Sequence, residues 1–127
     1  MDNDRSSVIT IGGEEYRLIL TTRATKEIGL RYGGIDKLGE RLMKEQDFSL
    51  ALNEILWLIV LLANQSVMIH NLQNKDAKRE LLTEETVELL TTPVELAQYK
   101  SAITEAMFKG MKRNIESEDD GKNPQAG

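Results

Sequence analysis

The side chains that could carry out catalysis are few and scattered in this chain. His70 is the only histidine, and there is no cysteine, so the usual nitrogen and sulfur ligand sets for zinc are absent. Serines such as Ser49 and Ser101 lack the glycine-flanked turn that exposes a nucleophilic hydroxyl. These features predict a protein that is not an enzyme and that needs no metal or cofactor, with His70 at a surface or at a helix end.

Paired glycines and paired acidic residues have structural interpretations as well. Gly12-Gly13 and Gly33-Gly34 match neither a phosphate loop nor a dinucleotide-binding pattern, so we expect a tight turn and a helix stop. Glu84-Glu85 and Asp119-Asp120 are adjacent in sequence, and neighbouring residues on a helix or strand point in different directions. The pairs therefore cannot aim two carboxylates at one substrate atom, and we expect them on the solvated surface.

Composition places the chain among soluble globular proteins. It has 127 residues, of which 40% are hydrophobic and 29% charged, and its net charge is -5. This length suits one domain, and the acidic balance speaks against nucleic acid as a partner. The polar start MDNDRSS lacks the basic and apolar regions of a secretory signal, so we expect a cytoplasmic protein.

The most apolar stretch is ILWLIVLLA, residues 55–63. A membrane span needs about 20 predominantly apolar residues, and this run is flanked by Asn53 and Glu54 before it and by Asn64 and Gln65 after it. A helix that is apolar all round is usually buried from several sides. We therefore expect a central core helix rather than a membrane segment.

The elements that surround this helix follow from turn and capping residues. The sequence predicts a β-hairpin over residues 8–20, with its turn at Gly12-Gly13. It predicts helices over residues 22–32, 35–45, 48–72, 84–90 and 93–115, a disordered arm at 1–7 and a disordered acidic tail at 116–127. The expected fold is α+β and predominantly α-helical, a single globular domain (8–115) in which the hairpin packs on about five helices around the central apolar one.

Local signals fix some helix ends and inner faces. Asp47 is a plausible N-cap, and Thr92, Pro93 and Glu95 form a capping box with the proline preferred at the first helical position. In the first helix, we expect Ala24, Ile28 and residues 30–32 to face inward. In the last helix, we expect an apolar stripe of Leu96, Tyr99, Ile103, Met107 and Met111.

Three stretches together resemble a known family. They are VITIGGEEYRLILTTRATKEIGLRYG, ALNEILWLIVLLANQ and ELAQYKSAITEAMFKGMKR, and in this order they are similar to the tail assembly chaperones of long-tailed, siphovirus-type phages and prophages of Gram-positive bacteria. The resemblance implies a small, helical, non-enzymatic protein of the host cytoplasm that is absent from the finished virion. It also implies that the chain binds the tape measure protein and helps to recruit tail tube subunits.

A client-binding surface can be placed on the expected helices. We expect Trp57, Leu61, Met107 and Met111 to receive an apolar helix of the tape measure protein in a groove, although core packing is the alternative for the two methionines. The same apolar face could pair two copies into a homo-oligomer. The competing function is a regulatory or scaffold interaction domain of a prophage or mobile element.

Overall fold

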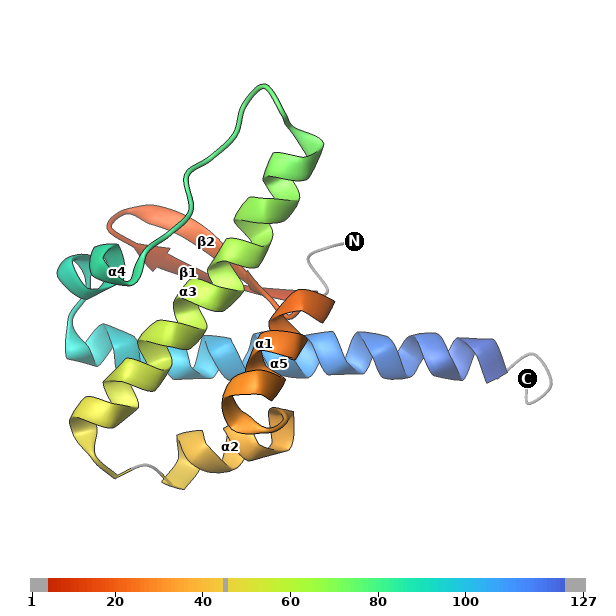
Figure 1. Ribbon diagram of the computed structural model, residues 1–127, viewed down its shortest axis with the longest axis horizontal. Coiled ribbons are helices and arrows are strands. Elements are labelled where there is room, and N and C mark those ends of the chain that lie inside the picture. The colour runs from red at the N-terminus through yellow and green to blue at the C-terminus, as the bar shows by residue number, and fades with distance from the viewer. Residues whose placement is uncertain (1–4, 45, 123–127) are drawn as a thin grey trace.

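The computed structural model describes residues 5–44 and 46–122, which form an antiparallel hairpin followed by five helices. The fold is α+β and predominantly helical, as expected (Figure 1). The strands are β1 (Ser6–Ile11) and β2 (Glu14–Ile19). The helices are α1 (Thr22–Tyr32), α2 (Ile35–Lys44), α3 (Phe48–Gln73), α4 (Glu84–Leu90) and α5 (Pro93–Lys122).

The hairpin begins earlier than expected. Ser6 and Ser7 pair with Ile19 and Leu18, so they belong to β1 and not to a disordered arm; residues 1–4 of that arm lie outside the described residues. The Ser7 hydroxyl donates to the carbonyl oxygen of Ala102 at 2.6 Å, which ties the start of the strand to α5. At the turn, Gly12 and Gly13 have φ angles of 58° and 85°, a region that glycine enters without steric cost.

The expected helix caps are present. The Asp47 side chain accepts from the backbone N–H of Leu50 at 3.1 Å. At the start of α5, the N–H of Glu95 donates to the Thr92 hydroxyl at 3.2 Å, and the Glu95 carboxylate accepts from the N–H of Thr92 at 2.8 Å. These bonds satisfy N–H groups that have no partner within a helix, so these two helix starts are specified locally.

The last helix runs past the end expected at Ile115. α5 continues to Lys122 and extends well beyond the body of the molecule (Figure 1). Residues 116–122 are therefore helical rather than disordered, and residues 123–127 lie outside the described part. The next proline is Pro124, and adding a residue to an existing helix avoids the cost of nucleation, so the helix can continue past Ile115.

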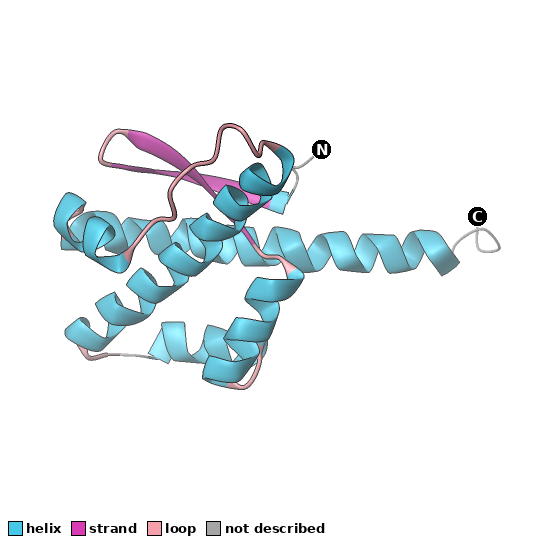
Figure 2. Cartoon of the chain, turned by 45° about the horizontal axis from the view of Figure 1, so that its top comes forward, coloured by secondary structure: helices cyan, strands magenta, loops and turns pink. Residues whose placement is uncertain are grey.

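The core forms around α3, the central apolar helix. α3 packs against β2 and α5, and α5 also packs against β1. Leu58, Ile59 and Leu62 of α3 are fully buried. The hairpin and α2 lie on opposite sides of α5 in both ribbon views (Figure 2). Burial of each large apolar side chain contributes roughly 1.5–3 kcal/mol, so α3 organises the fold.

The expectation that residues 30–32 face inward is wrong for Leu30 and Arg31, which are both exposed. Ala24 and Ile28 of α1 are fully buried, but Leu30 is 84% exposed. Leu30 lies two positions after Ile28, and residues two apart on a helix do not share a face. Its side chain therefore points away from the core.

By length and composition alone, α3 could cross a membrane. It has 26 residues, and 44% of its most apolar stretch is buried inside the protein. The helix also carries Glu54 and Gln65, both buried and both hydrogen-bonded to other side chains. A core helix of a globular domain has these properties, and the fold is consistent with a soluble protein.

Candidate functional site

A groove follows the side of α3 that faces α1 and the loop 74–83. It consists of two adjoining hollows of about 520 Å³ and 280 Å³ that share Arg23, Gln65, Met68 and Leu81 in their linings. The larger hollow lies beside Leu72 and the smaller one beside Trp57. We call the two together the α3 groove.

The floor of the α3 groove is a second apolar face of the central helix. Trp57, Leu61, Met68 and Leu72 all line it and recur every three to four residues or multiples of that spacing, which places them on one side of a helix. The core packing described above uses the other side of α3, so this face is left partly uncovered, with Leu72 75% exposed. The stretch from residue 57 to residue 72 spans about 22 Å at the usual helical rise, enough for about four turns of a partner helix.

The loop that forms one wall of the groove is fastened to α3. The Asn64 side chain donates to the carbonyl oxygen of Leu82 at 2.8 Å and accepts from its N–H at 2.7 Å. Asn71 makes the same pair of bonds with Arg79, at 3.0 and 2.8 Å, and His70 Nε2 lies 2.9 Å from the Ala77 carbonyl oxygen. Each asparagine side chain bonds both the N–H and the carbonyl oxygen of one loop residue, as the backbone of a neighbouring β-strand would. These bonds hold the loop in place, so the wall of the groove exists before any partner binds.

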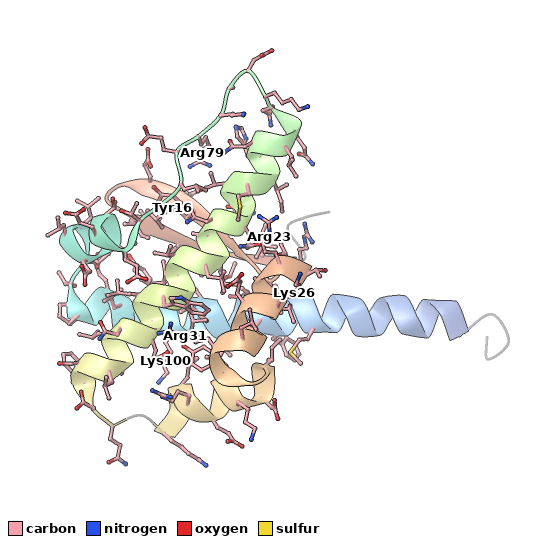
Figure 3. All side chains as sticks on the ribbon, viewed as in Figure 1. Tyr16, Arg23, Lys26, Arg31, Arg79 and Lys100 are labelled. Atoms are coloured by element: carbon pink, nitrogen blue, oxygen red, sulfur yellow. The ribbon has the colours of Figure 1, made fainter. Side chains whose placement is uncertain are left out.

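The groove carries opposite charges at its two ends. Arg23, Lys75 and Lys78 line the hollow beside Leu72, whereas Glu27 and Glu84 line the hollow beside Trp57, where Arg23 also contributes. The Arg23 guanidinium lies 3.4 Å from the Met68 sulfur, and Figure 3 shows Arg23 between the start of α1 and α3. An elongated partner would meet a cationic end and a more acidic end.

Trp57 is held in place by a network of polar side chains. Arg31 lies over its ring at 4.4 Å from the centroid, and the Tyr32 ring packs edge-on at 5.9 Å. Glu54 accepts from the Tyr32 hydroxyl and lies 3.6 Å from Arg31 and 3.5 Å from Arg41. This network joins α1, α2 and α3 and positions the Trp57 ring at the end of the groove.

The same network changes the ionisation of Tyr32. Burial and the hydrogen bond to Glu54 raise the pKa of Tyr32 to about 12, because both disfavour a negative charge on the phenolic oxygen. The hydroxyl therefore remains a donor to Glu54 across the ordinary pH range.

The residues expected to bind a partner separate into two places. Trp57 and Leu61 line the α3 groove. Met107 is only 7% exposed and belongs to the core, while Met111 is 42% exposed on α5 and does not line the groove. The stripe that contains both methionines faces the hairpin and α3, so the structure does not bring the two pairs together.

Sequence reasoning missed most of the groove lining, including three large apolar residues, Met68, Leu72 and Leu81. Met68 and Leu72 continue the helical spacing of Trp57 and Leu61 and could have been found by extending that stripe. Leu81 lies in the loop 74–83 and is 52% exposed; no sequence pattern places it against α3, because its position depends on the bonds to Asn64 and Asn71.

Among the side chains that the structure describes, no three histidine or acidic groups are close enough together to hold a metal ion. His70 lies in the last turn of α3 and contacts the loop, in agreement with the expected helix-end position. The groove is therefore the candidate site.

No family model matches the chain, and no curated protein or solved structure is significantly similar to it.

Proposed function

We propose that the chain is a phage tail assembly chaperone, acting in the host cytoplasm and absent from the finished virion, that binds an apolar helix of the tape measure protein in the α3 groove. One observation carries the proposal. A preformed apolar groove about four helical turns long runs beside the central helix and remains open in the folded chain. It has the shape required for a helix-in-groove interaction.

Such a groove suits a client whose apolar surface must be covered only temporarily. A tape measure helix exposes apolar side chains before the tail tube encloses it, and exposed apolar surface promotes aggregation. Covering the accessible parts of Leu72 and Leu81, together with the rest of the floor, contributes a few kcal/mol at about 25 cal/mol per Å². The loss of translational and rotational freedom on association offsets much of this gain. Each groove therefore binds weakly, which allows tail tube subunits to displace the chaperone.

The test is co-expression with the protein encoded immediately downstream, which this proposal identifies as the tape measure protein. We expect affinity capture of the tagged chain to recover that protein, and Leu72→Asp to lose it, because a carboxylate cannot be placed against an apolar helix without a large desolvation cost.

Leu30→Asp is the matched control. Leu30 and Leu72 are the same residue type and are 84% and 75% exposed, so neither substitution removes core packing. Circular dichroism is used to check that both variants fold. Capture that is equal in the two variants, or a soluble downstream protein that the unaltered chain does not retain, would refute the proposal.

A further inference from the structure

We infer that the α3 groove selects an amphipathic helix whose charges are segregated, acidic at the end beside Leu72 and basic at the end beside Trp57. The inference rests on the proposed function in one respect, since it states the chemistry of the helix that this groove receives. It would apply equally to any other client that presents such a helix.

The cationic end of the groove is free to bind carboxylates. Arg23, Lys75 and Lys78 are the charged residues that line the hollow beside Leu72, and all three are exposed. None of them is ion-paired with another described residue. Asp76 and Glu80 belong to the same loop, but neither lines this hollow.

The opposite end carries unpaired carboxylates. Glu27 and Glu84 line the hollow beside Trp57 and are both exposed, and neither is ion-paired with another described residue. Arg23 lines this hollow as well as the other one, and Arg31 is stacked on Trp57 and lies beside Glu54. The lining therefore changes from three cations without a carboxylate beside Leu72 to two carboxylates and Arg23 beside Trp57.

This distribution of charged residues also predicts the direction of the bound helix. Acidic residues stabilise the N-terminal turn of a helix and basic residues its C-terminal turn. A helix charged in this way places its acidic N-terminal half beside Lys75 and Lys78, at the C-terminal end of α3, and its basic half beside Glu27 and Glu84. The partner therefore lies antiparallel to α3.

The experiment uses the full chain and two synthetic helical peptides of about four turns, each stapled to hold the helix. Both carry the same leucine stripe and the same numbers of glutamate and lysine. In the segregated peptide, glutamate occupies the N-terminal half and lysine the C-terminal half, whereas in the interleaved peptide the two alternate. Dissociation constants are measured by fluorescence anisotropy at low and high salt.

We expect the full chain to bind the segregated peptide about tenfold more tightly than the interleaved one. A few exposed ion pairs, each contributing less than about 1 kcal/mol, together give a difference of this size. Salt should reduce this preference. The double substitution Lys75→Glu and Lys78→Glu should abolish it. The control double substitution Lys37→Glu and Lys100→Glu makes the same change in net charge at residues that line neither hollow, and it should leave the preference intact.

Equal affinity for the two peptides, a preference that survives Lys75→Glu with Lys78→Glu, or no binding of either peptide would each overturn the inference. Failure of the proposed function is seen separately. If the chain captures the tape measure protein and Leu72→Asp loses it, but the two peptides bind equally, only the charge selection is refuted. The expected peptide preference without capture of the tape measure protein would refute only the proposed client.

Discussion

Substitution of Gly110 tests how closely α5 packs against the end of the hairpin. A Cβ atom added at Gly110 would lie 2.8 Å from Cβ of Leu20 and 3.1 Å from its Cδ2. Leu20 is only 8% exposed, and its Cβ is bonded to the backbone, so it cannot turn away as the end of a flexible side chain would. Gly110→Ala must therefore displace α5 or the chain after β2, and overpacking of this kind costs about 1–3 kcal/mol.

The higher helix propensity of alanine opposes the destabilisation caused by overpacking. Alanine is more favourable than glycine in a helix interior by about 0.8–1 kcal/mol. For Gly110→Ala the net loss in free energy of unfolding is then about 0–2 kcal/mol. Gly39→Ala in α2 isolates the helix effect, because a Cβ at Gly39 would meet nothing within 4 Å, and we expect it to stabilise the protein by about 0.5–1 kcal/mol.

The measurement is urea unfolding of both variants, followed by circular dichroism and by fluorescence of Trp57, the only tryptophan. The difference between the two variants isolates the contact with Leu20 and should be about 1–3 kcal/mol. In thermal unfolding, a chain of this size changes its melting temperature by about 4 °C per kcal/mol. If Gly110→Ala proves as stable as Gly39→Ala, α5 does not pack against Leu20 as described.

Three further substitutions test the polar network, the capping box and the core. The pKa of Tyr32 is raised from 10.0 to about 12, so the unfolded chain loses its phenolic proton first and the free energy of unfolding falls between these pH values; Tyr32→Phe should make alkaline urea titrations flatter, and an unchanged slope would contradict the assignment. Thr92→Ala removes the acceptor for the N–H of Glu95 and should cost about 1 kcal/mol in thermal unfolding, whereas a neutral result would mean that the capping box contributes nothing. Ile59→Ala, at a fully buried position, should cost about 2–5 kcal/mol, and Leu30→Ala should stay within about 0.5 kcal/mol of the original chain; similar losses for both would place Leu30 in the core.

Much of the local structure could be predicted from residues next to one another in the chain. The turn at Gly12 and Gly13 needs positive φ, and the start of α5 needs only Thr92 and Glu95 within one turn. Such features depend on backbone groups a few residues away, so no knowledge of the tertiary fold is required. The end of α5 was less predictable, because the residues after Ile115 can be helical without burial and nothing in their pattern requires them to be.

The sequence by itself determined that residues 55–63 form a buried central helix, because nine consecutive apolar side chains surround a helix on every side. For the same reason, it could not determine which of those sides the rest of the chain covers. Only the tertiary structure decided that Leu58 and Ile59 are fully buried while Trp57 and Leu61 line a groove. It also decided that Met107 is buried in the core. Helical periodicity leaves the faces of a helix equivalent, and contacts between residues distant in the chain decide which face is buried.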